Sequence, residues 1–247
     1  MRIGFLGTGD LTVALGKVWA AAGHEIFVAG RSSDNATKAA GEFTGTPIAP
    51  AGLAAVAEVI VVAVAWEGLE QILSLAGAPR GSLAGKPVID CTNAVDYSTG
   101  RLKPETGSAA EFVASLAPGA HVVKALHLFA GTSWLGREVD AEGQAVGVRG
   151  DEVGGEEQAV GVRGDEVGGE GQAVGVRGDE GQVVAVCGDD AGALEVTSRL
   201  IGDLGGRAAI VGELSSARQL EEAAGFVMRV AAAGHNPRSA VPDVRRQ

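Results

Sequence analysis

The sequence contains few cysteines, no excess of basic residues and no long hydrophobic run. Only 2 of its 247 residues are cysteines, and neither Cys91 nor Cys187 has a second Cys or His at the spacing of a metal-ligand pair. A disulfide framework and a zinc site are therefore not indicated. We interpret both residues as buried free thiols of a reducing compartment and expect no bound metal.

The other two shortages argue against membrane and nucleic-acid partners. The longest apolar run, residues 59–66, covers eight positions, whereas a membrane-spanning helix needs about 20. The N-terminus leads directly into a glycine-rich turn and lacks the form of a signal peptide. With 20 basic against 31 acidic residues, the formal net charge is −11, which disfavours binding to phosphate backbones. We expect a cytoplasmic protein that binds neither membranes nor nucleic acids.

Glycine, in contrast, is abundant, with 39 residues, and an internal repeat accounts for much of the excess. Residues 142–179 read EGQAVGVRGDEVGG, EEQAVGVRGDEVGG and EGQAVGVRGD, and residues 180–189 add a divergent fourth copy, EGQVVAVCGD. The first three copies hold twelve glycines, and nine acidic residues against three arginines. Their spacing is not that of a solenoid family, so the segment resembles one strand-coding unit copied in tandem.

Only the fourth copy is suited to the core of a sheet. A central strand of an α/β sheet is buried on both faces and continuously apolar, as residues 183–187 are. The upstream copies place Gly and Arg where this copy has Ala185 and Cys187, and a buried Arg there would lack a partner. We therefore predict that residues 142–179 form an insertion outside the core sheet, either flexible or paired as exposed hairpins.

Outside the repeat, short apolar strands alternate with amphipathic helices. We predict strands over residues 2–6, 25–29, 46–48, 59–64, 87–90, 121–125, 183–187 and 208–211, and helices over 10–22, 34–41, 51–57, 67–75, 108–116, 191–204 and 215–233. This alternation predicts an α/β fold with a doubly wound, mainly parallel sheet. The last helix has an apolar stripe, with Glu221 and Glu222 placed outside it. That stripe packs either on its own sheet or on a second subunit, and in the second case the protein would be a homodimer.

The first strand ends in Gly7-Thr8-Gly9-Asp10-Leu11, and a helix begins at once. Glycines at these positions let the backbone turn tightly and approach a pyrophosphate, which then lies against the exposed amides of the helix N-terminus. Thr12 replaces the third glycine of the usual fingerprint. Because the required strand, turn and helix are all present, we predict a dinucleotide site rather than a plain structural turn.

The end of the second strand indicates which dinucleotide is bound. An NAD-binding protein usually has an acidic residue there, which accepts the ribose hydroxyls. This chain has Arg31, Ser32 and Ser33 instead, and an Arg can pair with the 2′-phosphate of NADP. We therefore predict NADP as the cofactor, and expect Asp34 to cap the following helix.

Seven blocks of the sequence are also those of a known family: 7–11 (GTGDL), 30–31 (GR), 61–66 (VVAVAW), 85–93 (GKPVIDCTN), 123–126 (VKAL), 187–190 (CGDD) and 212–221 (GELSSARQLE). Together they resemble the NADPH-dependent reductases of the deazaflavin coenzyme F420, whose fold is the Rossmann fold. The resemblance spans nearly the whole chain except residues 142–179. It divides the chain into a Rossmann domain over 1–141, the insertion over 142–179, and the last strands and closing helix of the same domain over 180–247.

The resemblance implies an oxidoreductase that passes hydride between NADPH and coenzyme F420. The implied site has a pyrophosphate turn, a 2′-phosphate group and a nicotinamide side: Gly7, Thr8, Gly9, Asp10 and Leu11; Arg31 and Ser32; Ala65 and Trp66. The ring of Trp66 either flanks the nicotinamide or caps the sheet edge.

The sequence identifies no catalytic acid or base, because hydride transfer between two cofactors requires mainly orientation. Lys124 and His127 follow a strand end, at the edge where ligands bind in open α/β sheets. They either contact the deazaflavin or are solvated loop residues. Two alternatives to the leading function stay open: an NADPH-dependent reductase of a small carbonyl or imine, and a non-catalytic NADP sensor whose repeat contacts a partner protein.

Overall fold

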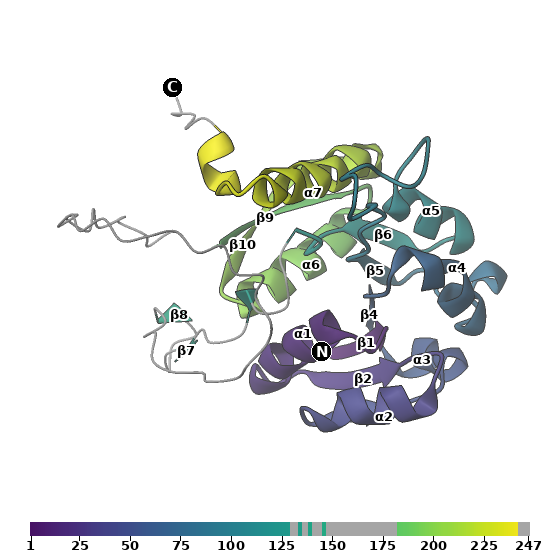
Figure 1. Ribbon diagram of the computed structural model, residues 1–247. Coiled ribbons are helices and arrows are strands. Elements are labelled where there is room, and N and C mark those ends of the chain that lie inside the picture. The colour runs from purple at the N-terminus through teal and green to yellow at the C-terminus, as the bar shows by residue number, and fades with distance from the viewer. Residues whose placement is uncertain (129–132, 135–137, 140–144, 147–181, 242–247) are drawn as a thin grey trace.

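The computed structural model describes residues 1–128, 133–134, 138–139, 145–146 and 182–241 (Figure 1). Its centre is an eight-stranded sheet with the order β10-β9-β6-β5-β4-β1-β2-β3. All neighbouring strands are parallel except β6 and β9. The predicted doubly wound, mainly parallel α/β sheet is therefore confirmed.

The elements follow the predicted alternation closely. The strands of the sheet are β1 Arg2–Leu6, β2 Glu25–Ala29, β3 Gly45–Pro47, β4 Val59–Val62, β5 Pro87–Asp90, β6 His121–Lys124, β9 Gln182–Gly188 and β10 Gly206–Gly212. The helices are α1 Asp10–Ala21, α2 Ser33–Gly41, α3 Pro50–Val56, α4 Trp66–Leu75, α5 Ala109–Leu116, α6 Ala191–Asp203 and α7 Ala217–Ala232, with short 3-10 turns η1 Ala78–Arg80, η3 Leu214–Ser216 and η4 Pro237–Ala240.

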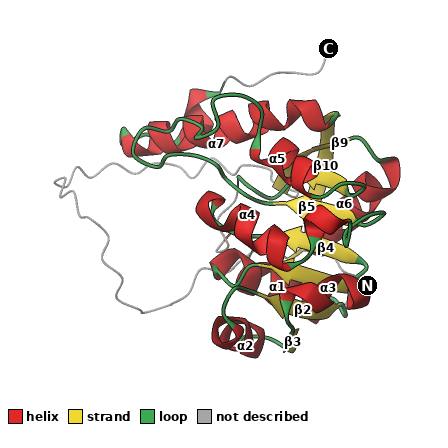
Figure 2. Cartoon of the chain, turned by 90° about the vertical axis from the view of Figure 1, so that its right-hand side faces the viewer, coloured by secondary structure: helices red, strands yellow, loops and turns green. Residues whose placement is uncertain are grey.

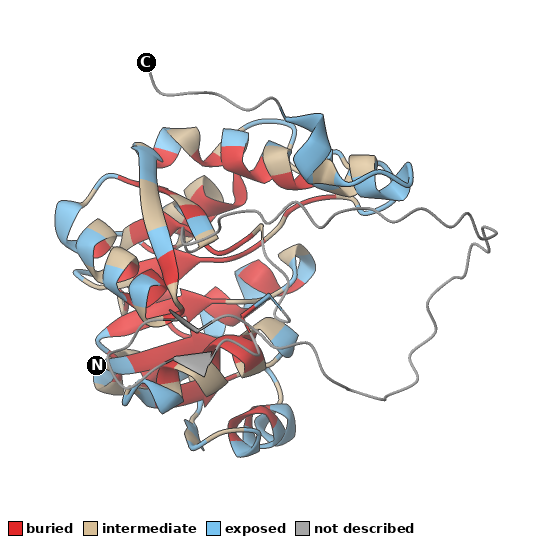
Figure 3. Cartoon of the chain, turned by 90° about the vertical axis from the view of Figure 1, so that its left-hand side faces the viewer, coloured by how far each residue is buried: buried red, intermediate tan, exposed pale blue. Residues whose placement is uncertain are grey.

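Helices cover both faces of the sheet (Figure 2). On one face α1, α2 and α6 bury the side chains of alternate strand positions such as Ile3, Phe5 and Val61. On the other face α3, α4, α5 and α7 cover the intervening positions such as Leu6 and Val62. The strands consequently form the most buried layer of the molecule (Figure 3). This two-sided burial explains why the central strand segments are mostly apolar.

Two contacts fasten the first helix and strand to the end of α6. Trp19 of α1 packs on Phe5, with ring centroids 5.7 Å apart, and its indole N–H donates to the carbonyl of Leu200 at 2.9 Å. His24, in the turn before β2, lies 3.0 Å from the carboxylate of Asp203 through its Nε2. Sequence patterns showed neither contact, because both join residues far apart in the chain.

The strand prediction for the fourth repeat copy is confirmed by β9, but its burial is less complete than expected. Val184, Val186 and Cys187 are buried, whereas Val183 is 50% exposed. The strand lies next to the edge strand β10, and only its C-terminal part is covered on both faces. The requirement for apolar side chains on both faces therefore applies mainly to the last residues of β9.

Most of the insertion, residues 142–179, lies outside the described residues. The exception is β8 Ala145–Val146, which pairs antiparallel with β7 Glu138–Val139. The division of the chain at residues 142 and 179 stays a prediction.

Both cysteines are free and buried, as predicted. Burial raises the pKa of the Cys91 thiol, and it raises the pKa of Cys187 to about 11. Neither sulfur is therefore a thiolate at neutral pH. In the described part of the chain, no group of three or more His, Cys, Asp or Glu residues could hold a metal ion, and none of the helices is long and apolar enough to cross a membrane.

Candidate functional site

The turn between β1 and α1 has the geometry that a phosphate site requires. Gly7 has a φ of +139°, and a Cβ added there would lie 2.0 Å from the carbonyl oxygen of Ala63, so only glycine fits. Gly9 is the N-cap of α1 and receives no side-chain capping bond. A Cβ added at Gly9 would meet no atom within 4 Å. The space beside Gly9, at the start of α1, is therefore open.

A cavity of about 270 Å³ lies in front of this turn. It brings together five of the residues predicted from the sequence: Gly7, Thr8, Gly9, Arg31 and Ala65. Its other walls come from the end of β4 and the start of α4. A second cavity of about 410 Å³ shares Gly30 and Arg31 with it and extends along α2 and the residues after β3. Arg31 thus lies between two adjacent hollows.

The Arg31 side chain extends from the end of β2 toward α4. Its Nη1 donates to Oε1 of Gln71 at 3.0 Å, and its guanidinium lies over the backbone of Gly68. The one acidic residue in the walls of the first cavity is Glu67, which forms a salt bridge with Lys103. That bond lowers the pKa of the Glu67 carboxyl. An exposed cation therefore stands at the position where NAD-binding proteins have an acid.

The prediction that Asp34 caps α2 was wrong. The helix begins at Ser33, and the Oγ of Ser32 accepts from the amide of Asn35 at 3.3 Å. Ser32 is therefore the N-cap, because the capping residue immediately precedes the first helical residue. Its hydroxyl hydrogen remains able to donate to a ligand.

The remaining predicted residues of the nucleotide site do not line either cavity. Asp10 and Leu11 lie in the first turn of α1, with the Asp10 side chain exposed and Leu11 half-buried. Trp66 is the first residue of α4, and its ring packs on Phe112 of α5 at a centroid distance of 5.1 Å. A role of this ring in capping the sheet edge stays a prediction. A contact with the nicotinamide stays a prediction.

Lys124 and His127 are both buried, so the alternative of solvated loop residues was wrong. Lys124 is the last residue of β6 rather than a residue beyond it. Its Nζ lies 2.9 Å from Oδ2 of Asp90 and 2.9 Å from Oε1 of Glu221, and it also donates to the carbonyl of Thr92. Burial acts to lower the pKa of Lys124, but the two carboxylates outweigh it and raise that pKa. All three ammonium hydrogens are therefore engaged within the protein.

Glu221 completes this buried charge cluster from α7. It is 0% exposed, which corrects its predicted place outside the apolar stripe. Its carboxylate also accepts from the amides of Ala109 and Ala110, at 2.9 and 3.3 Å, in the first turn of α5. Burial raises the pKa of Glu221 against the opposing effect of Lys124. The cluster thus joins β5, β6, α5 and α7.

His127 lies beside the cluster. Its Nε2 is 2.9 Å from the carbonyl oxygen of Leu220, and its own carbonyl accepts from Nδ2 of Asn93 at 2.6 Å. Burial, together with the nearby Lys124 charge, lowers the pKa of His127 to about 3. The imidazole is therefore neutral at physiological pH.

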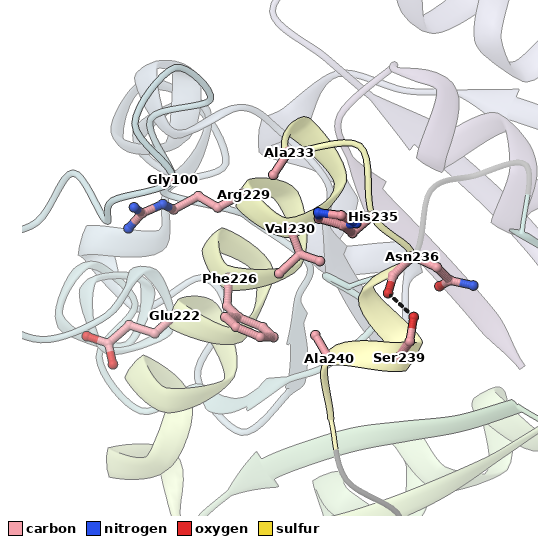
Figure 4. A pocket seen from close by; sticks show the side chains of 10 residues that line it. All are labelled: Gly100, Glu222, Phe226, Arg229, Val230, Ala233, His235, Asn236, Ser239 and Ala240. Atoms are coloured by element: carbon pink, nitrogen blue, oxygen red, sulfur yellow. Dashed lines mark hydrogen bonds between the residues drawn. The ribbon is translucent and has the colours of Figure 1, made fainter. Parts of the chain in front are cut away.

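A larger cavity of about 740 Å³ lies between α7 and η4, near Gly100 (Figure 4). Phe226 and Val230 of α7 face Ala240 of η4 across it, and Ser239 donates to the carbonyl of Asn236 at 2.8 Å. None of the residues predicted to bind a nucleotide lines this cavity. Volume alone therefore does not identify the nucleotide site.

The sheet topology is that of a doubly wound fold, and the glycine turn at the start of α1 has the form that such folds use for dinucleotides. Residues 2–94 match the family described as NADP oxidoreductase, coenzyme F420-dependent. This match confirms the resemblance seen in the sequence, over the segment that contains the turn, Arg31 and the residues after β5. No curated protein matches the chain.

Solved structures share the fold. A protein of Arthrobacter sp. fb24, provisionally described as an F420-dependent NADP-reductase, is 24% identical, with 96% of each chain covered and a TM-score of 0.68. The protein SMa0349 of Sinorhizobium meliloti is 19% identical, with 88% of each chain covered and a TM-score of 0.63. An imine reductase of Myxococcus stipitatus in complex with NADP+ is 16% identical, with a TM-score of 0.59. The match covers 95% of this chain but 63% of that enzyme.

Proposed function

We propose that this protein is an NADP-dependent oxidoreductase that passes hydride between NADPH and coenzyme F420. The observation that carries the proposal is the open glycine turn at the start of α1, with the exposed guanidinium of Arg31 beside it. The family matched by residues 2–94 supports both cofactors. The NADP+ complex of the imine reductase with the same fold supports the first.

The geometry of the turn fits a pyrophosphate. The space at Gly9 is open, and the amides of the first turn of α1 have no side-chain cap. A pyrophosphate there accepts hydrogen bonds from these amides and is stabilised by the helix dipole. Gly7 and Thr8 line the same cavity.

Arg31 and Ser32 bind the 2′-phosphate in this proposal. A guanidinium forms bidentate, charge-assisted hydrogen bonds to a phosphate, and the Ser32 hydroxyl can add one more. The carboxylate of Glu67 is engaged by Lys103, so its repulsion of the phosphate is reduced. Ala65 and Trp66, at the start of α4, lie on the nicotinamide side.

When bound, the nicotinamide supplies or accepts the hydride, and the protein contributes orientation. The described residues at the ends of β5 and β6 agree with this view, because they offer no suitable proton donor. The ammonium of Lys124 is fully engaged, and His127 is neutral with a strongly lowered pKa. Neither is suited to protonate an alkoxide, which reduction of a carbonyl requires. Their predicted contact with the deazaflavin stays a prediction, and for Lys124 it would require loss of an internal bond.

The direct test mixes the purified full chain with NADPH and oxidised F420 and follows the deazaflavin absorbance. Loss of that absorbance, dependent on the protein, is the expected result. A parallel reaction with NADPH and a cyclic imine examines the second candidate, which the shared fold with the imine reductase favours. If NADPH were consumed only with the imine, the hydride acceptor would be an imine and not F420. NADPH binding without turnover of either acceptor would point to the non-catalytic sensor.

A further inference from the structure

Three buried polar atoms at the carboxyl ends of β5 and β6 lack a hydrogen-bond partner among the described residues. They are Oγ1 of Thr92, Oδ1 of Asn93 and Nδ1 of His127. The two strands are parallel neighbours, with Asp90 opposite Lys124, so both segments leave the sheet at the same edge. The bond from Asn93 to the carbonyl of His127 joins them directly. Because unpaired buried polar groups are rare in folded proteins, this group indicates a ligand.

The hydrogen-bonding character of the three atoms follows from their neighbours. Nε2 of His127 lies beside the carbonyl of Leu220 and must donate to it, so Nδ1 carries a lone pair. The amide nitrogen of Asn93 already donates to His127, which leaves its oxygen as an acceptor. The Thr92 hydroxyl can donate or accept. Two acceptors and one hydroxyl complement a ligand group with N–H donors and a carbonyl oxygen.

The buried charge cluster holds these atoms in place. The amide of Thr92 donates to Oδ1 of Asp90 at 3.0 Å, and its carbonyl accepts from Nζ of Lys124. Leu220, which positions the His127 ring, precedes Glu221 of the same cluster. The three atoms are therefore organised before any ligand arrives.

Their place in the sheet matches one end of a dinucleotide. The strand order is β2-β1-β4-β5-β6, with the proposed 2′-phosphate at β2 and the pyrophosphate at β1. At about 4.8 Å between strands, β5 lies roughly 10 Å beyond β1. This is the distance over which a ribose and a nicotinamide ring extend, and the second half of a doubly wound sheet binds that part of the cofactor.

We propose that Thr92, Asn93 and His127 bind the carboxamide of the nicotinamide ring. The carboxamide NH₂ donates to Oδ1 of Asn93 and Nδ1 of His127, and the Thr92 hydroxyl donates to the carboxamide oxygen. The assignment rests on the proposed function, because it requires a nicotinamide dinucleotide. It gives His127 a ligand contact that needs no change in its neutral state.

The test compares NADP+ with its 3-acetylpyridine analogue, in which a methyl group replaces the carboxamide nitrogen and the carbonyl is kept. Dissociation constants are measured by calorimetry for the natural chain and for Asn93→Leu, His127→Leu and Thr92→Val. The natural chain should bind NADP+ about 10-fold more tightly, as expected for one or two neutral hydrogen bonds. Asn93→Leu and His127→Leu should each reduce this ratio. Thr92→Val should weaken both ligands and leave the ratio unchanged, because both keep the carbonyl.

The ratio of the two dissociation constants reports the contact to the carboxamide nitrogen and is insensitive to damage to the fold, since both ligands bind the same folded protein. Thr12→Val is the matched control, because Thr12 is also buried with an unpartnered Oγ1 among the described residues but lies in α1. It should keep the natural ratio. A natural ratio near one, or a ratio preserved in both Asn93→Leu and His127→Leu, would overturn the assignment alone. Failure of the natural chain to bind NADP+ would overturn the proposed function and this assignment together.

Discussion

The two ends of the sheet edge that is formed by the carboxyl ends of the strands carry charge in opposite ways. At β1 and β2, Arg31 is exposed and has one hydrogen bond, to a neutral glutamine. At β5 and β6, Lys124 is fully buried and bonded to two carboxylates and a carbonyl. The first cation is free to meet an incoming phosphate. The second is saturated within the protein and stabilises the backbone that carries uncharged ligand contacts.

This difference separates charges that can select a ligand from charges that stabilise the fold. A charge selects a charged ligand only if its own partners can be exchanged, and an exposed side chain exchanges them at little cost. A buried ion pair is costly to break because the abandoned charge stays in a medium of low polarity. Substitutions at the buried end should therefore affect stability, and substitutions at the exposed end should affect binding.

The largest effect is expected from Lys124→Met, which leaves Asp90 and Glu221 buried without their cation. The free energy of unfolding should fall by about 3–5 kcal/mol, measured by urea denaturation. Lys103→Met, at the exposed pair with Glu67, is the control and should change stability little. If Lys124→Met were as stable as the parent, the cluster would not have the structural role described here.

At the exposed end, Gly9→Val should strongly weaken cofactor binding without loss of the fold. The new side chain enters the open space before α1, where the pyrophosphate would approach. Loss of its charge-assisted hydrogen bonds, worth about 3 kcal/mol, corresponds to roughly 100-fold weaker binding. Calorimetry with NADPH measures the change. Gly7→Val provides the contrast and should unfold the protein, because its Cβ would overlap the carbonyl of Ala63.

Arg31→Glu should reverse or remove the preference for NADPH over NADH. Loss of a charge-assisted contact worth about 1.5–3 kcal/mol corresponds to a change of roughly 10- to 150-fold in relative affinity. Parallel titrations with the two dinucleotides give the ratio, and the melting temperature should stay near that of the parent. Equal affinities for both dinucleotides in the natural chain would contradict the assignment of Arg31.

The smallest effect is expected from deleting residues 142–179, a segment that belongs to neither end of this sheet edge. The deletion joins Ala141 to Glu180. The shorter connection should stabilise the protein slightly, because the entropic cost of closing a loop falls by about 0.6 kcal/mol per halving of its length. Thermal melting should be cooperative and close to that of the parent. The control is Val184→Asp with Val186→Asp in the full chain, which buries two carboxylates in β9. A well-folded double variant would show that another copy forms the strand.

The parts of the site that were predictable from the sequence are those encoded locally. Gly7 and Gly9 lie within one turn, and Arg31 follows the next strand, so strand, turn and helix patterns were enough. The buried cluster joins residues that are far apart in the chain, and helical periodicity placed Glu221 on the wrong side. One signal was available: Lys124 stands within the apolar block HVVKAL. A lysine buried in a strand requires a carboxylate partner.

The position of Glu221 almost one hundred residues after Lys124 also bears on the order of folding during synthesis. Lys124 and Asp90 leave the ribosome long before α7, so β6 carries its cation with only one of its two carboxylates until α7 docks. The amides of α5 that Glu221 caps wait for the same event. Nascent chains that stop before α7 should therefore remain loosely packed at this end of the sheet, and such truncated products would be readily recognised by proteases.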